Sequence, residues 1–219
     1  MKKLSLVLLI TSSLAMSSHK KTKIIFFGDS ITEMGINKGG YIDRIQTALN
    51  GKKMQQHYQL TGAGVGGNKV YDLYLRVEED VLDKKPDVVV IWVGVNDVWH
   101  KTSGIGTDIE KYEKFYVALI KKMQAKKIKL VLTTPAAIGE KFDGTNPQDK
   151  DLDAYSDVIR KLATLYHCKL ADLRKIFMQY EKENNTGNKE AGILTTDRVH
   201  LNDKGNQLVA DEMWKALMK

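Results

Sequence analysis

The sequence has a single cysteine, Cys168, among its 219 residues, so no disulfide can form within the chain. Cys168 lies in the short strand-like segment 168–172. We therefore expect a buried, inert thiol there rather than a nucleophile. No cysteine stands near the end of the amino-terminal apolar segment, which argues against a lipid-modified cysteine anchor.

Long apolar runs are also scarce. The apolar segment Leu4–Ile10 is shorter than the about 20 residues that a membrane-spanning helix needs. It follows two lysines and precedes the small residues Thr11–Ser18, a pattern typical of a secretory signal peptide. We predict a signal peptide over residues 1–17, with Ala15-Met16-Ser17 as the cleavage site. The protein would then be secreted or periplasmic, with no stable membrane insertion after the signal is removed.

Acidic residues are outnumbered by basic ones. Lys and Arg number 34 and Asp and Glu number 27, which gives a net charge of +7 and a pI of about 9.2. Removal of Lys2 and Lys3 with the signal leaves +5, which favours weak attraction to anionic surfaces. The lysines are spread through helical stretches such as residues 121–129, and no aromatic residues interleave with them. We therefore expect no nucleic-acid partner.

Strand-like segments alternate along the chain with segments whose apolar residues recur at helical spacing. The clearest strand is residues 87–93, a run of β-branched residues without polar alternation, as in a central parallel strand. The alternation predicts one α/β domain over residues 18–219, with three α/β/α layers around a five-stranded parallel sheet. The expected strands are residues 24–27, 58–60, 87–93, 128–135 and the segment around Cys168, and the expected helices are residues 41–49, 70–82, 109–125, 151–166, 173–183 and 204–218.

The remaining segments are expected to be irregular. Residues 98–107 and 136–150 are predicted to be loops at the carboxyl edge of the sheet, where loops often shape a substrate site. Residues 184–190 are predicted to be a flexible polar connection.

Four segments carry the residues expected to do chemistry. In the first, residues 24–27 lead into Gly28-Asp29-Ser30, which places a serine hydroxyl at the carboxyl end of a buried strand, where open α/β sheets bind ligands. A serine needs a base, an orienting carboxylate and donors to a developing oxyanion. Asp197 and His200, three residues apart, supply the first two, and the segments Gly62–Asn68 and Gly94–Asp97 each follow a strand-like run.

These four segments resemble, in their order, those of the SGNH hydrolases of the GDSL esterase and lipase group, and the resemblance spans residues 23–219. It implies the flavodoxin-like fold of that family. It also implies that Ser30 is the nucleophile, His200 the general base and Asp197 its orienting partner, with no metal or organic cofactor.

The same resemblance implies an oxyanion hole. Its donors would be the backbone N–H groups of Ser30 and Gly67 and the side-chain amide of Asn96. Many members of the family have Asn where this chain has Gly62. We expect this departure to affect the support of the loop rather than the chemistry.

Rival interpretations exist for several of these residues. Residues 62–67 match part of a dinucleotide fingerprint, but they would belong to the second βα unit, and no acidic residue ends the next strand. His100 is a rival base without an acidic partner at a short, fixed spacing, and we expect Asp97 to have a structural role. The pattern Asp197-x-x-His200 is also compatible with a metal ion, but no further His or Cys completes a coordination shell.

The sequence thus predicts an exported serine esterase that acts through an acyl-enzyme intermediate. Short acyl groups are expected, with acetyl esters of carbohydrates as the favoured substrates. The alternatives are a lysophospholipase or thioesterase, an O-acyltransferase, and a non-catalytic carbohydrate-binding module on the same fold. The expected partner is a small-molecule or glycan ester, and the oligomeric state remains open.

Overall fold

The computed structural model describes residues 20–218. The predicted signal peptide, residues 1–17, lies outside the described residues. Among residues 20–218, no helix combines the length and the apolar character that crossing a bilayer requires.

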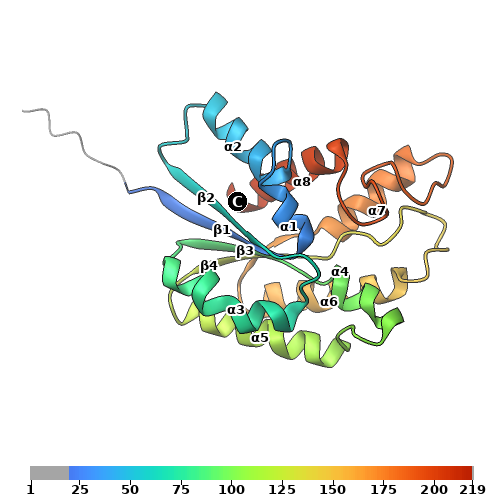
Figure 1. The fold of residues 1–219 in the computed structure, drawn as a ribbon, viewed down its shortest axis with the longest axis horizontal. Helices are drawn as coiled ribbons and strands as arrows, with labels where there is room; N and C mark the ends of the chain where they lie inside the picture. The colour runs from blue at the N-terminus through green and yellow to red at the C-terminus, as the bar shows by residue number, and fades with distance from the viewer. Residues whose placement is uncertain (1–19, 219) are drawn as a thin grey trace, which may run out of the picture.

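Five parallel strands form one sheet in the order β2-β1-β3-β4-β5 (Figure 1). This is the flavodoxin-like order, in which the chain changes direction between β1 and β3. The predicted number of strands, their direction and the fold class are therefore confirmed. The strands are β1 (Thr22–Gly28), β2 (Tyr58–Gly64), β3 (Val88–Trp92), β4 (Lys129–Thr133) and β5 (Lys169–Ala171).

Helices cover both faces of the sheet, as the alternation of elements predicts. On one face α2 packs against α8, and on the other α3, α5 and α6 lie side by side (Figure 1). The helices are α1 (Ser30–Gly35), α2 (Tyr41–Gly51), α3 (Val70–Asp80), α4 (Val95–Trp99), α5 (Ile109–Gln124), α6 (Asp149–Leu165), α7 (Leu173–Asn184) and α8 (Asp203–Met218), with 3₁₀ turns η1 (Leu82–Lys84) and η2 (His100–Ser103).

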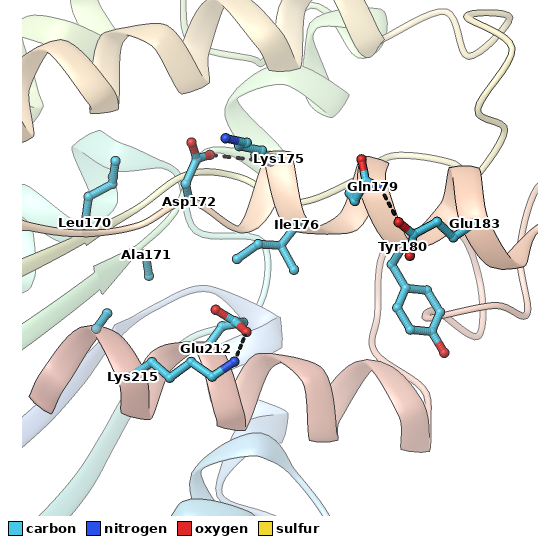
Figure 2. A pocket seen from close by; sticks show the side chains of 11 residues that line it. Leu170, Ala171, Asp172, Lys175, Ile176, Gln179, Tyr180, Glu183, Glu212 and Lys215 are labelled. Atoms are coloured by element: carbon cyan, nitrogen blue, oxygen red, sulfur yellow. Dashed lines mark hydrogen bonds and ion pairs between the residues drawn. The ribbon is translucent and has the colours of Figure 1, made fainter. Parts of the chain in front are cut away.

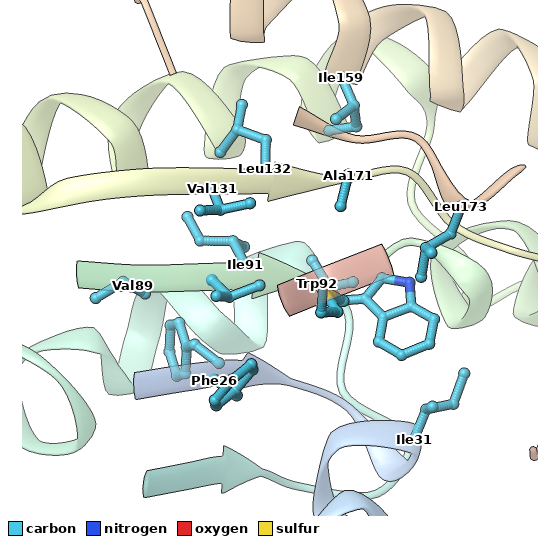
Figure 3. Packing of buried hydrophobic residues seen from close by; sticks show 14 of the residues in the cluster. Phe26, Ile31, Val89, Ile91, Trp92, Val131, Leu132, Ile159, Ala171 and Leu173 are labelled. Atoms are coloured by element: carbon cyan, nitrogen blue, oxygen red, sulfur yellow. The ribbon is translucent and has the colours of Figure 1, made fainter. Parts of the chain in front are cut away.

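The central strands are buried on both faces, which explains their unbroken apolar sequence. Phe26, Val89 and Ile91 have no more than 1% of their surface exposed and pack between the helical layers (Figure 3). Trp92 contacts Tyr41 of α2 edge-on, with ring centroids 5.6 Å apart. This packing fixes the positions of the carboxyl ends of β1 and β3 relative to each other.

Three sequence predictions need correction. Residues 98–107, predicted to be a loop, contain the end of α4 and all of η2; five residues are too few to show helical periodicity. Residues 136–148 form no helix or strand, as predicted, and residues 136–140 among them are buried. The connection 184–190 is anchored by Asn185, whose buried side-chain amide donates to the carbonyls of Glu140 and Lys189.

The third correction concerns Cys168, which lies just before β5 and is half-buried rather than buried. Burial nevertheless raises the pKa of the Cys168 thiol to about 11. The thiol is therefore protonated at neutral pH and a poor nucleophile.

Candidate active site

Ser30 is the first residue of α1 and is separated from the end of β1 by Asp29 alone. Asp29 is the N-cap of this helix, and its Oδ1 accepts the Ile31 N–H at 3.0 Å. A Cβ atom on Gly28 would lie 2.4 Å from both the Thr32 hydroxyl and the Trp92 carbonyl, so only glycine allows this tight approach. The Gly-Asp-Ser sequence therefore turns the chain sharply and leaves the Ser30 side chain partly exposed at the carboxyl edge.

Ser30, His200 and Asp197 form a continuous hydrogen-bonded chain. The Ser30 Oγ lies 2.9 Å from His200 Nε2, and His200 Nδ1 lies 2.7 Å from Asp197 Oδ2. A carboxylate can only accept at Nδ1, so the ring carries its proton there and presents a lone pair at Nε2 to the serine. The structure thus brings together the three predicted residues from opposite ends of the chain.

The turn that carries Asp197 and His200 is held by its own hydrogen bonds. Asp197 Oδ1 accepts the N–H groups of Val199 and His200 at 3.1 and 2.8 Å. Partial burial acts to raise the pKa of Asp197, but the hydrogen bonds from His200 and Val199 outweigh it and hold the pKa below its usual range. Asn202 then caps α8 through a bond from the Gly205 N–H at 3.0 Å, which anchors the end of the turn.

The predicted oxyanion donors lie on three connections, those that follow β1, β2 and β3. A Cβ atom on Gly66 would lie 4.0 Å from Ser30 Cβ, and the next residue, Gly67, has a positive φ of 74°. Asn96, 5% exposed, lies at the start of α4 and donates from Nδ2 to the Asn68 carbonyl at 3.1 Å. The glycine-rich turn, Ser30 and Asn96 are therefore adjacent.

The glycines of the segment Gly62–Asn68 allow neighbouring backbone and side chains to pack closely. A Cβ atom on Gly64 would lie 2.0 Å from the Glu33 nitrogen, because α1 lies directly against the end of β2. Gly62, expected to affect the loop, instead lies within β2, where a Cβ atom would collide with Ile36 at 2.3 Å. The departure from the family pattern therefore concerns packing of the strand against the segment after α1.

Arg76 of α3 is a residue of this region that sequence reasoning missed. Its guanidinium donates to the Gly28 carbonyl at 2.7 Å, the Ala63 carbonyl at 3.1 Å and the Asn68 side chain at 2.7 Å. It therefore joins the end of β1, the end of β2 and the glycine-rich turn. Its place within a helix of mixed charges gave no sequence signal of these contacts.

Glu140 is a second residue that sequence reasoning missed, and it is fully buried. Its Oε2 accepts the Ile193 N–H at 2.8 Å, and its Oε1 accepts the N–H groups of Leu194 and Thr195 at 2.5 and 2.6 Å. These three residues lead into the Asp197–His200 turn. The only sequence indication of this role was an isolated acidic residue after the apolar residues 136–138. Its hydrogen-bond partners lie more than 50 residues away.

Two buried carboxyls flank the catalytic segments. Burial raises the pKa of Asp29 to about 7 and that of Asp97 to about 6. Asp97 is fully buried and accepts the Val70 N–H at 3.2 Å, while its carbonyl accepts the Thr107 N–H. These contacts place Asp97 as a link between α3, α4 and the segment before α5.

His100 lies in η2 and differs from His200 in its contacts. Its buried Nδ1 has no hydrogen-bond partner among the described residues. Burial, and then the Lys69 ammonium, lower the pKa of His100. It therefore lacks the carboxylate that orients His200.

The hollow drawn in Figure 2, with a volume of about 470 Å³, lies between α7, α8 and β5. Glu212 and Lys215 form an ion pair at its wall, and neither Ser30 nor His200 lines it. Within residues 20–218 no group of three or more His, Cys, Asp or Glu side chains is arranged to hold a metal ion. The hydrogen-bonded chain at the carboxyl edge is thus the arrangement best suited to chemistry in the described part of the molecule.

A family model described as the GDSL-like lipase/acylhydrolase family matches residues 26–208. The chain is also similar to the crystal structure of an acetyl xylan esterase, AlAXEase, with 61% sequence identity and a TM-score of 0.88. That similarity covers 89% of this chain and 99% of the other.

Two further relatives are more distant. An acetylxylan esterase of Geobacillus stearothermophilus is 27% identical over 205 residues, which is 86% of this chain and 90% of the relative. An uncharacterized lipoprotein of Bacillus subtilis, YqeF, is 24% identical over 213 residues and 85% of each chain.

Proposed function

This chain belongs to the GDSL-like lipase/acylhydrolase family and is a serine hydrolase acting on carboxylic esters; we propose that it removes acetyl groups from carbohydrates through an acyl-enzyme on Ser30. The observation that carries the mechanism is the Ser30–His200–Asp197 chain, with contacts of 2.9 and 2.7 Å. The substrate class follows from the similarity, at 61% identity, to an acetyl xylan esterase.

In the first half-reaction the Ser30 Oγ attacks the acetyl carbonyl carbon while His200 Nε2 takes the hydroxyl proton. The tetrahedral intermediate then collapses, the bond from carbon to the sugar oxygen breaks, and His200 returns the proton to that oxygen. The deacetylated sugar leaves, and the acetyl group remains on Ser30. Asp197 keeps the ring in the required tautomer and stabilises the imidazolium that forms.

In the second half-reaction a water molecule gives a proton to His200 as its oxygen attacks the acetyl-serine. Collapse releases acetic acid, and the proton passes from His200 back to the Ser30 oxygen. No oxidant, reductant or metal is needed for this balance.

The oxyanion of each intermediate would be held by the N–H groups of Ser30 and Gly67 and by Asn96. The Ser30 N–H lies in the first turn of α1, where helix N–H groups lack intrahelical partners. Gly67 has a backbone conformation that glycine adopts without strain. The burial of Asn96 and its bond to Asn68 limit the motion of its amide, and preorganised donors of this kind stabilise developing charge most strongly.

We also propose that the protein is exported after cleavage of residues 1–17. The basic start, the short apolar segment and the small residues after it support this. Similarity to a lipoprotein of Bacillus subtilis is consistent with export.

The test is an activity panel on the purified protein. Release of acetate from acetylated xylo-oligosaccharides, and faster hydrolysis of 4-nitrophenyl acetate than of the butyrate and octanoate esters, are expected. A preference for octanoate or lysophospholipid would refute the acetyl assignment. Transfer of acetyl to an added sugar in preference to water would identify an acyltransferase, and full activity of Ser30→Ala would refute the mechanism.

A further inference from the structure

Pairs of lysines recur at one edge of the sheet. Lys20-Lys21 precede β1, Lys52-Lys53 lie before β2, Lys84-Lys85 before β3 and Lys126-Lys127 before β4. All eight side chains are exposed. Because the strands are parallel, their amino ends meet at the same edge, opposite the edge where α1 follows β1 (Figure 1). We call these eight residues the basic edge.

Backbone conformation makes three of these lysines unusual. Lys53, Lys85 and Lys127 have positive φ angles of 55°, 50° and 61°. The N–H of each bonds the carbonyl three residues earlier, in Asn50, Leu82 and Gln124 respectively. Glycine or asparagine normally fills this left-handed position after a helix, and a lysine side chain adopts it only with strain.

Helix dipoles explain part of this arrangement. A lysine after the last turn of a helix is favoured by the negative end of the dipole. That effect does not require the lysine to occupy the strained position. It also does not apply to Lys20 and Lys21, which follow no helix of the described residues.

Half of the basic edge lines one hollow. Lys20, Lys21, Lys126 and Lys127, together with Lys129, line a single shallow hollow of about 470 Å³. Acidic residues share this edge, including the exposed Asp83 and also Asp87, which pairs with Lys20 at 3.7 Å. The lysines outnumber these acidic residues, so this edge carries a net positive charge.

We propose that the basic edge docks on an anionic phospholipid membrane surface. Its lysine pairs precede four adjacent strands, which span about 14 Å at the usual strand spacing, so the charge is spread along a broad edge and matches a planar array of headgroups. The proposal rests on the proposed export, because cleavage of residues 1–17 would leave Lys20-Lys21 close to the new amino terminus of a protein released at a membrane.

Docking in this way is compatible with catalysis. The seven residues of β1 separate the basic edge from Ser30 by about 23 Å at the usual rise of a strand. The site at the carboxyl edge would therefore face away from the membrane, toward a soluble or polymeric ester.

The three lysines with positive φ angles provide a specific test. The triple variant Lys53→Gly, Lys85→Gly and Lys127→Gly removes three charges from the basic edge and relieves backbone strain, so it should fold at least as stably as wild type. The matched control is Lys114→Gln, Lys150→Gln and Lys182→Gln, exposed helix residues in α5, α6 and α7. Both variants lose the same charge, and all three full-length proteins keep the same amino-terminal segment.

Binding is measured by sedimentation with vesicles of phosphatidylcholine containing 30% phosphatidylglycerol, and with pure phosphatidylcholine vesicles. Wild type and the control should bind the anionic vesicles, more weakly at high salt, and the glycine variant should bind at least tenfold less tightly. Equal binding of the glycine variant, or equal binding of wild type to neutral vesicles, would overturn the proposal. Preference for a soluble acidic polysaccharide over the vesicles would also overturn it.

Hydrolysis of 4-nitrophenyl acetate separates this result from the proposed function. The glycine variant should retain wild-type kcat and KM, because its substitutions lie at the edge opposite Ser30. Loss of vesicle binding with full esterase activity would support the docking surface whatever the natural ester is.

Discussion

Asp197 contacts His200 at two points. Its Oδ2 accepts the ring Nδ1–H at 2.7 Å, and its Oδ1 accepts the His200 backbone N–H at 2.8 Å. One carboxylate therefore fixes both the tautomer of the base and the turn that carries it.

Asp197→Ala should lower kcat by roughly 10²–10⁴, because both contacts are lost at once. His200→Ala should lower kcat further, since no base remains to accept the serine proton. His100→Ala should leave kcat on 4-nitrophenyl acetate near wild type. Steady-state kinetics of the three variants check this order, and an inactive His100→Ala beside an active His200→Ala would reverse our assignment of the base.

Asn96→Ala should lower kcat by roughly 10²–10³ with a smaller change in KM, because an oxyanion donor acts mainly in the transition state. Asn96 also bonds the Asn68 carbonyl, so the thermal midpoint of the variant must be measured beside its kinetics. If KM rose while kcat stayed constant, Asn96 would be a substrate-binding residue.

Glu140→Gln should lower both stability and kcat. The carboxylate accepts three backbone N–H groups, whereas Gln offers one oxygen and turns an NH₂ group toward a donor. Bonds to a charged acceptor contribute about 1.5–3 kcal/mol each, so we expect a loss of about 2–4 kcal/mol in unfolding free energy. At temperatures where the variant is folded, kcat should fall about 10- to 100-fold with little change in KM.

The matched control for this variant is Glu181→Gln. Glu181 is also buried, and its Oε1 has no hydrogen-bond partner among the described residues. Burial raises the pKa of Glu181 to about 8, so a neutral amide resembles its state at pH 7. An equal loss of kcat in both variants would show that any change in this buried cluster disturbs the site, and Glu140 would then have no specific role.

Asp29→Asn should gain stability relative to wild type as the pH rises from 4 to 8. Burial raises the pKa of Asp29 from 3.8 to about 7, so in this window the folded protein holds a proton that the unfolded chain has released. The contribution of this group to folding therefore falls with rising pH, by up to about 4 kcal/mol. Asn keeps the cap to Ile31 and has no proton to lose.

Urea unfolding at several pH values measures this difference. Asp83→Asn, a change at an exposed carboxylate of η1, should follow wild type across the range. A constant offset between Asp29→Asn and wild type from pH 4 to pH 8 would contradict the prediction.

The sequence predicted the site residues that come soon after strands. Ser30 and Asn96 follow β1 and β3, and the carboxyl ends of parallel strands necessarily share an edge. Glu140 and Arg76 were missed because their partners are backbone groups, which carry no sequence signature, and lie in distant segments. The basic edge was missed for a related reason: its lysine pairs are about 32 to 42 residues apart and come together only because each helix returns the chain to the same edge.

The bond between Ser30 and His200 joins residues 170 positions apart. A contact of such sequence separation carries a large loop-closure cost, and the turn that carries His200 is anchored to the start of α8 through Asn202. Recovery of esterase activity during refolding should therefore lag behind recovery of helical circular dichroism. Esterase activity would in this way report when the turn that carries His200 comes to lie beside Ser30.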